Sequence, residues 1–407
     1  MTTELEQIRI DTTDLAVGMF VCGLDRPWEE TQFPLQGIEV RSEDDVRALR
    51  ELCRFVYIDR RRELALGRRL STLARSDRRE AAFRRATTYA DKIGVQEEMP
   101  RAREALRATS ELLDRIYDDI ASGRELSVEY VEQVVRPLVA SVLRSSDAFL
   151  FLDGMRKHDN YTYSHAIGCG ALAAAFGRHL GLPEDTILSL ATGGLLMDIG
   201  KTRLPEEILR RPGALTLQEI DVVQTHVAHG LDIVKSGGIN DPDVLDVVRT
   251  HHERFDGSGY PGHLTGNTIP MAGRMLAIID SYDAMCSVRP YRTAISRHDS
   301  LQEIYRGRDT LYQAELVEQF QVCLGVYPTG SRVELNSGEV AVVMEQNQVR
   351  RLRPTVLLIS TPEKQALENF RILDLLNQAS DGERIEIQRA LAIDEYEIDT
   401  AGFLTAT

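Results

Sequence analysis

The residues of this 407-residue chain that could do chemistry together are imidazoles and carboxylates, and they gather in one stretch. Eight of the nine histidines fall between His158 and His263. Imidazole and carboxylate together suit iron, manganese or zinc, and a pair of such metals suits displacement at a phosphodiester. The stretch from Asp159 to Arg292 is therefore predicted to hold a divalent metal centre that acts on, or at least binds, a phosphate ester.

The candidate nitrogen ligands are His165, one of His226 and His229, which share a helix face at i,i+3 spacing, and the adjacent pair His251 and His252. A single helical histidine such as His165 is, by itself, more typical of a satisfied core residue. Adjacent His251 and His252 would point about 100° apart on a regular helix, so both reach one metal only near an irregular helix end. The Asp256-Gly257-Ser258-Gly259 segment supplies such an end, which makes this pair the stronger signal.

Two aspartates, Asp198 and Asp280, each follow an apolar helical run. A buried carboxylate without a partner is costly, so each needs one. For Asp198 the residues leave two interpretations open. Gly200 could end the helix while Lys201 faces its dipole, or Asp198 could bridge two metals while Lys201 reaches a substrate phosphate.

The candidate phosphate-binding cations after Asp280 are Arg289 and Arg292, because guanidinium groups grip phosphate through paired hydrogen bonds. The segment Gly257–Gly262 matches a dinucleotide-binding G-x-G-x-x-G pattern by letters alone. Helical histidines precede it and Pro261 lies inside it, so we interpret it as a rigid loop that lets Tyr260 face the site.

The elements that must position these groups are predicted to be helices. A capping box at Thr216-Leu217-Gln218-Glu219 starts one of them, and Gly181-Leu182-Pro183 separates two others. The apolar spacing predicts helices over Ala166–Leu180, Thr186–Met197, Glu219–Val234 and Val244–His251.

The predicted metal-binding region covers residues 146–325, and we expect three further regions before and after it. Residues 1–65 form a small α/β module, and 66–145 a helical linker region that Pro100 breaks. Residues 326–407 form a β-rich extension. The predicted elements outside the central region are a helix near Glu43–Cys53 and strands at Met19–Cys22, Ile38–Val40, Phe55–Ile58, Arg332–Leu335, Val340–Met344 and Thr355–Ile359. The fold class is mainly α.

The linker region carries an arginine run from Arg75 to Arg85, which we interpret as a solvated helix face. Such helices often join a sensory module to an output domain, so a homodimer or a signalling-protein partner is a hypothesis for this region. The formal net charge of −15 argues against bulk nucleic acid or anionic lipid as partners. We find no signal-peptide pattern at the N-terminus and no apolar run long enough to span a membrane. We expect the five scattered cysteines to be free thiols, which is typical of a reducing compartment. We therefore expect a cytoplasmic protein.

Taken in the order in which they occur along the chain, the motifs resemble those of the HD-GYP family, a branch of the HD phosphohydrolases. The resemblance covers roughly residues 146–325. Residues 1–65 resemble the small module found before some HD-GYP domains, and the segment from Gly325 resembles the extension of the same subgroup. The motifs that carry the resemblance are Tyr161-Thr162…His165, Asp198-Ile199-Gly200-Lys201, Thr216…Glu219, His226…Gly230, His251-His252-Glu253…Gly259-Tyr260-Pro261 and Asp280…Asp283…Arg289-Pro290-Tyr291-Arg292.

This resemblance implies an all-helical HD-type domain that hydrolyses cyclic di-GMP with two or three divalent metals, iron or manganese foremost. It implies phosphate binding by Lys201, Arg289 and Arg292, and an acidic Asp159 beside that lysine. Tyr161 stands where members with a third metal have a glutamate, so two metals are expected. The implied metal ligands are His165, Asp198, His226, His251, His252 and Asp280, with Asp198 bridging.

One residue departs from the family pattern: Met197 stands where the His-Asp pair has its histidine. A thioether is a poor ligand for Fe(II) or Mn(II). We therefore expect a weakened first site, formed by His165, Asp198 and Asp280, beside a complete second site.

Three functions stay open from the sequence. The first is a cyclic-di-GMP phosphodiesterase, with turnover slowed by Met197. The second is a degenerate member that binds the nucleotide or a partner protein. The third is a hydrolase of another phosphate ester, such as the linear dinucleotide.

Overall fold

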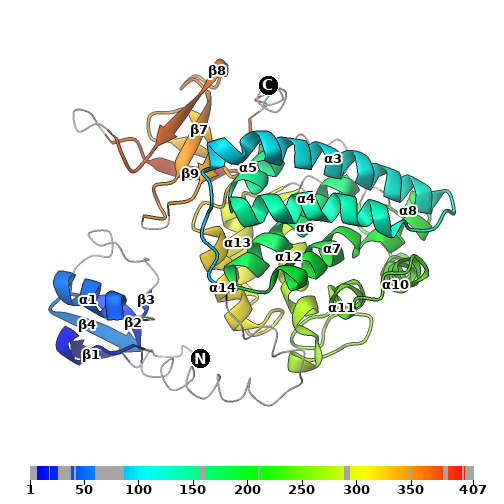
Figure 1. The fold of residues 1–407 in the computed structure, drawn as a ribbon, viewed down its shortest axis with the longest axis horizontal. Coiled ribbons are helices and arrows are strands. Elements are labelled where there is room, and N and C mark those ends of the chain that lie inside the picture. The colour runs from blue at the N-terminus through cyan, green and yellow to red at the C-terminus, as the bar shows by residue number, and fades with distance from the viewer. Residues whose placement is uncertain are drawn as a thin grey trace. The chain divides into compact units, whose positions relative to one another are not determined.

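The computed structural model describes residues 7–17, 19–25, 38–40, 43–59, 87–155, 161–209, 211, 213–287, 294–347, 350–378, 384–396 and 398. The chain divides into two compact units, and Figure 1 shows their elements. One unit consists of Met1–Ala81 and Asn347–Arg351, and the other of Ala82–Gln346 and Leu352–Thr407. The arginine run from Arg75 to Arg85 lies outside the described residues.

The N-terminal unit is an antiparallel sheet with strand order β1-β4-β2-β3 and one helix. Val46 and Leu49 of the helix share a core with Val21, Val56 and Ile58 of the sheet. The predicted helix and three strands are confirmed, whereas β1 was not predicted because it offers only two alternating isoleucines. The elements are β1 (Gln7–Asp11), β2 (Phe20–Leu24), β3 (Ile38–Glu39), α1 (Glu43–Leu52) and β4 (Phe55–Asp59).

The larger unit begins with two long helices, α3 (Val95–Ala121) and α4 (Val128–Arg144), which pack against each other. The expected break at Pro100 is wrong, because Pro100 lies inside α3. A proline so close to the helix start removes one backbone hydrogen bond, while the buried face of the remaining helix still holds it against α4. Glu98 of α3 is buried and accepts a hydrogen bond from Arg144 of α4.

The remaining helices form the bundle that holds the predicted ligands. The capping box at Thr216 is confirmed, as is the helix end before Pro183. The single helix predicted over Glu219–Val234 is instead two, divided at Thr225. The helices are α5 (Ala148–Met155), α6 (Tyr161–His179), α7 (Glu184–Leu196), η5 (Ile199–Arg203), α8 (Glu206–Leu209), α9 (Leu217–Gln224), α10 (His226–Ser236), α11 (Pro242–Thr250), η6 (Gly266–Thr268), α12 (Met271–Cys286), α13 (Arg297–Arg306) and α14 (Ala314–Leu324).

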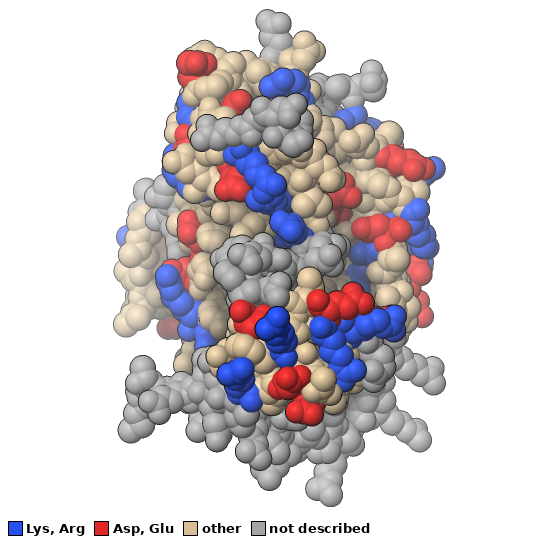
Figure 2. Space-filling model, turned by 90° about the vertical axis from the view of Figure 1, so that its left-hand side faces the viewer, with Lys and Arg blue, Asp and Glu red and all other residues tan. Residues whose placement is uncertain are grey.

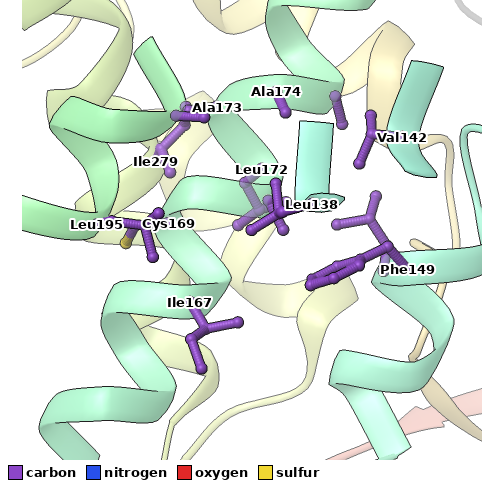
Figure 3. Close-up of a cluster of buried hydrophobic side chains, with 14 of the residues drawn as sticks. Leu138, Val142, Phe149, Ile167, Cys169, Leu172, Ala173, Ala174, Leu195 and Ile279 are labelled. Atoms are coloured by element: carbon purple, nitrogen blue, oxygen red, sulfur yellow. The ribbon is translucent and has the colours of Figure 1, made fainter. Parts of the chain in front are cut away.

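The core of this bundle is built around α6, whose small and apolar side chains are almost all buried. Figure 3 shows part of this core, where Leu172 lies beside Leu138, Ala173 beside Ile279 and Cys169 beside Leu195. Burial of α6 on all sides explains its weak amphipathic pattern. A rigid α6 fixes one wall of the predicted site.

An antiparallel sheet of order β8-β7-β6-β5-β9 completes the unit. It packs on the bundle through β6 against α5 and β9 against α13. The predicted hairpin and third strand are confirmed, and the fold is mainly helical as expected. The strands are β5 (Arg332–Leu335), β6 (Val340–Glu345), β7 (Thr355–Ser360), β8 (Ala366–Asp374) and β9 (Ile387–Leu391).

The surface mixes charges of both signs. Figure 2 shows basic and acidic side chains next to one another over the described part of one face. Among the described helices, none is long and apolar enough to cross a membrane. All five cysteines are free, as expected, and Cys53, Cys169 and Cys286 are buried.

Candidate metal centre

Five neighbouring segments of the helical unit bring the six predicted metal ligands together (Figure 1). All of them are buried apart from His252, whose side chain is 15% exposed. The ligands are His165 on α6, Asp198 between α7 and η5, His226 at the start of α10, His251 and His252 at the end of α11, and Asp280 on α12.

The Asp198 carboxylate lies at the middle of this group. Its Oδ1 atom is 3.4 Å from Nε2 of His226 and 3.8 Å from Nε2 of His251. Its Oδ2 atom is 3.7 Å from Nε2 of His165 and 2.6 Å from Nζ of Lys201. One carboxylate therefore faces histidines on two sides, which is the arrangement that a bridging ligand requires.

The hydrogen bonds of His226 and His251 fix which ring nitrogen carries the proton. The Nδ1 atom of His226 is 2.7 Å from the carbonyl oxygen of Val223, and Nδ1 of His251 is 3.1 Å from that of Val248. Because a carbonyl oxygen only accepts, each Nδ1 donates, and Nε2 is the ring nitrogen left to bind a metal.

These ring nitrogens converge. The two Nε2 atoms lie 3.4 Å apart and both face Asp198 Oδ1, which has no hydrogen-bond partner in the described chain. Three electron-rich atoms without a proton between them are costly to bury, whereas a shared cation stabilises all three. The donor set of Asp198, His226, His251 and His252 fits a divalent transition metal.

A second group lies around His165. Its Nδ1 atom is 2.8 Å from Asp283 Oδ2, and its Nε2 atom is 3.1 Å from Asp280 Oδ1. A carboxylate behind a histidine orients the ring and makes its other nitrogen a better ligand. Cys169, one turn further along α6, places Sγ 3.7 Å from Nδ1 of His165 and completes a second cluster with metal-ligand spacing.

The protonation states favour cation binding at neutral pH. Burial lowers the pKa of His226 to about 4 and also depresses that of His252, so both rings are neutral. Burial alone would raise the pKa of Asp198, but Lys201 and the facing histidines outweigh it and hold that pKa well below its usual range. Burial raises the pKa of Cys169 to about 12, so its thiol stays protonated.

Glycines allow the elements to approach closely enough to form the centre. A Cβ atom at Gly200 would lie 2.0 Å from the carbonyl oxygen of His226, so η5 and α10 touch through their backbones. A Cβ atom at Gly168 would lie 2.5 Å from Asp283 Oδ1. Gly200 therefore sets the distance between Asp198 and His226, and Gly168 lets Asp283 reach His165.

The predicted loop lies against the centre. The Tyr260 ring stacks on the ring of His252, with centroids 4.7 Å apart. Buried Glu253 holds the loop by accepting hydrogen bonds from the backbone amides of Gly262, at 2.6 Å, and Leu264, at 3.0 Å. Tyr260 is thus held beside the predicted ligands.

Not every predicted site residue can be placed. Asp159, Arg289 and Arg292 lie outside the described residues. Lys201 contacts Asp198, a pairing that the sequence reasoning linked instead to a phosphate or to the helix dipole. Sequence reasoning also assigned no role in the site to Asp283, Cys169 and Glu253, although Cys169 follows His165 at i,i+4 and Asp283 follows Asp280 at i,i+3.

Comparisons with known proteins identify two domains. The HD domain family matches residues 138–316. A domain of unknown function, DUF3391, matches residues 7–131. The second match spans the N-terminal sheet and all of α3.

Several known proteins are similar in sequence to this chain. The cyclic di-GMP phosphodiesterase PA4108 of Pseudomonas aeruginosa is 31% identical over 90% of this chain and 88% of its own length. A cyclic di-GMP phosphodiesterase of Thermotoga maritima is 35% identical over 40% of this chain and 44% of its own length. A solved structure, Bd1817, an HDG"Y"P protein from Bdellovibrio bacteriovorus, covers 77% of this chain and 98% of its own, with a TM-score of 0.46 and 15% identity. The chain belongs to the family of HD-domain cyclic di-GMP phosphodiesterases that carry an N-terminal DUF3391 domain.

Proposed function

We propose that this protein is a metal-dependent phosphodiesterase that hydrolyses cyclic di-GMP to the linear dinucleotide or to GMP. The observation that carries the proposal is the buried Asp198 Oδ1 atom, which lacks a hydrogen-bond partner in the described chain and faces two histidine nitrogens. The named activity of relatives such as PA4108 supports the choice of substrate.

The ligand groups divide into two halves that share Asp198. His226, His251 and His252 would hold one divalent cation with Asp198, and His165 and Asp280 the other. Two cations held in this way would supply an activated water and would neutralise the charge of the scissile phosphate. This mixture of nitrogen and oxygen ligands suits iron, manganese or zinc, and the resemblance to the HD-GYP family favours iron or manganese.

The remaining residues bind and orient the substrate. Lys201 is partly exposed and already carries a positive charge beside Asp198, so its ammonium group is suited to a phosphate oxygen. Tyr260, stacked on His252, offers an aromatic surface for a base. We assign phosphate contacts to Arg289 and Arg292, and to Asp159 the orientation of Lys201.

The two halves are unequal in this proposal. Met197 is buried in the apolar core, and its thioether offers no nitrogen to the half formed by His165, Asp198 and Asp280. That half then binds its cation more weakly than the complete set around His226. Because both cations take part in displacement, we expect slow turnover.

The test compares the native protein with Met197→His and, as a size-matched control, Met197→Leu. Metal content is measured by elemental analysis after loading with Mn²⁺, and hydrolysis is followed with cyclic di-GMP as substrate. We expect Met197→His to gain metal occupancy and turnover, and Met197→Leu to behave like the native protein. If the native protein hydrolyses cyclic di-GMP as fast as Met197→His, then Met197 does not weaken its half of the metal centre.

A second candidate function, nucleotide binding without hydrolysis, is favoured by the same buried thioether. It predicts tight binding of cyclic di-GMP by the native protein, measured by calorimetry, with no product formed by any of the three proteins. Hydrolysis of the linear dinucleotide alone would instead assign the third function, a hydrolase of another ester.

A further inference from the structure

A residue outside the HD domain match reaches the neighbourhood of the metal centre. Tyr117 lies near the end of α3, and the HD match begins only at residue 138. The helix packs on α6, which carries His165, and on η5, which follows Asp198. Tyr117 itself is only 3% exposed. Its side chain is therefore part of the interior that surrounds the centre.

The ring of Tyr117 is fixed by its neighbours. It packs edge-on against the ring of Tyr163, with centroids 5.1 Å apart and an interplanar angle of 72°. Tyr163 precedes His165 by two residues on α6. Burial raises the pKa of Tyr117, and the charge of Asp198 adds to this effect, so the hydroxyl is a donor and not a phenolate.

This hydroxyl has no hydrogen-bond partner in the described chain. A buried hydroxyl left in that state costs about 1–3 kcal/mol, so it calls for a physical reason. Asp198 Oδ1 belongs to the residue just before η5, on which α3 packs, and it too is without a partner in the described chain. An unused donor and an unused acceptor on neighbouring elements would both be satisfied by a cation and its ligands.

We propose that Tyr117 is a positioning residue of the metal centre, whose hydroxyl donates a hydrogen bond to the coordination shell of a cation that Asp198 helps to hold. The inference rests on the proposed function and extends it to a residue of the DUF3391 match. It gives the centre a stabilising contact from α3, which lies outside the HD match.

The test uses the full-length protein, stripped of metal and titrated with Mn²⁺ alone by calorimetry. Tyr117→Phe keeps the ring and removes the hydroxyl. The matched control is Thr109→Val, which removes another buried hydroxyl from α3, one that donates to the carbonyl oxygen of Val134. We expect Tyr117→Phe to weaken one of two Mn²⁺ sites about 10–100-fold, as loss of a residue behind the ligands does.

The stability of the metal-free protein separates this role from a merely structural one. Tyr117→Phe should leave the thermal midpoint of the metal-free protein unchanged or higher, because an unpaired hydroxyl is removed. Thr109→Val should lower that midpoint and leave both Mn²⁺ affinities unchanged. Native affinity at both sites in Tyr117→Phe overturns the inference alone, whereas a native protein that binds no Mn²⁺ overturns the proposed function as well.

Discussion

Lys201 Nζ lies 2.6 Å from Asp198 Oδ2, so one lysine neutralises the carboxylate around which the candidate metal ligands are arranged. The same oxygen faces His165 Nε2 at 3.7 Å. Asp198 Oδ2 is therefore shared between Lys201 and the side of the site where His165 and Asp280 would hold a cation.

Replacing Lys201 by methionine should destabilise the metal-free protein. The change leaves the Asp198 carboxylate buried without its cation, and we expect a loss of roughly 2–3 kcal/mol, less than for a fully buried pair because Lys201 is partly exposed. Urea unfolding in the presence of a chelator measures this loss. Saturating Mn²⁺ should remove most of the difference between variant and native protein.

The control for this experiment is Arg203→Met, two residues further along. Arg203 pairs with Asp232 at the surface, where an ion pair contributes about 0–1 kcal/mol. Equal unfolding midpoints of Lys201→Met and Arg203→Met in chelator would show that Lys201 does not stabilise Asp198.

Adding one methyl group at Gly200 should damage both stability and metal binding. The new Cβ atom would lie 2.0 Å from the carbonyl oxygen of His226, so η5 and α10 must move apart. Overpacking of this kind costs about 1–3 kcal/mol or more. Gly200→Ala should therefore lower the thermal midpoint and reduce the Mn²⁺ stoichiometry.

Gly94→Ala is the matched control, because nothing lies within 4 Å of a Cβ atom built at Gly94. It should lower the free energy of unfolding by about 1 kcal/mol, because alanine is a poorer N-cap than glycine, and should leave the Mn²⁺ stoichiometry unchanged. Full Mn²⁺ stoichiometry in Gly200→Ala would contradict the close-approach argument.

The metal-free protein should lose stability as the pH falls from about 6.5 towards 4. His226 has a pKa of about 4 in the folded protein against 6.5 when unfolded, so between these values the unfolded chain binds the extra proton. Stability therefore rises with pH across this window, by roughly 3 kcal/mol for His226 alone. The depressed pKa of His252 acts in the same direction.

Asp198 titrates in a separate window. Its pKa lies below the ordinary value of 3.8, so its contribution is present above that pH and is lost only in stronger acid. Unfolding free energies of native protein and His226→Gln, measured between pH 4 and pH 7, test the assignment. The variant should show the shallower dependence, and identical slopes would contradict it.

Glu253→Ala should weaken substrate binding more than it slows turnover. The carboxylate holds the Tyr260 loop through the amides of Gly262 and Leu264, and it is not one of the candidate metal ligands. Freeing the loop should reduce kcat/KM roughly 10–100-fold, mainly through KM. Glu253→Gln, which keeps one acceptor oxygen, should lie between the native protein and Glu253→Ala in steady-state assays.

The sequence was sufficient for features with local causes. The capping box at Thr216 and the β5–β6 hairpin follow from short-range hydrogen bonding and turn chemistry, and both are present. The candidate ligand set could be named because its members lie in recognisable motifs, most of them near helix ends, although Asp280, expected at the end of a buried helical stretch, lies inside α12. The position of Asp198 between two groups of histidines depends on long-range packing, which no local pattern contains.

The errors have physical reasons as well. Pro100 was expected to break a helix, but the cost of one lost hydrogen bond is smaller than the gain from packing α3 on α4. The break at Thr225 was missed because apolar spacing continues across it. Tyr117 could not be found from sequence, because a tyrosine on an amphipathic helix is ordinarily a core residue.

The continuity of α3 has a mechanical consequence. Glu98, tied to Arg144, and Tyr117 are 19 residues apart on one helix, which corresponds to about 28 Å along its axis. Because the helix is continuous, a shift or rotation of its first turns would also displace the hydroxyl of Tyr117. If a displacement of α3 changes the affinity of the centre for a cation, then binding of the cation must change the free energy of that displacement by the same amount.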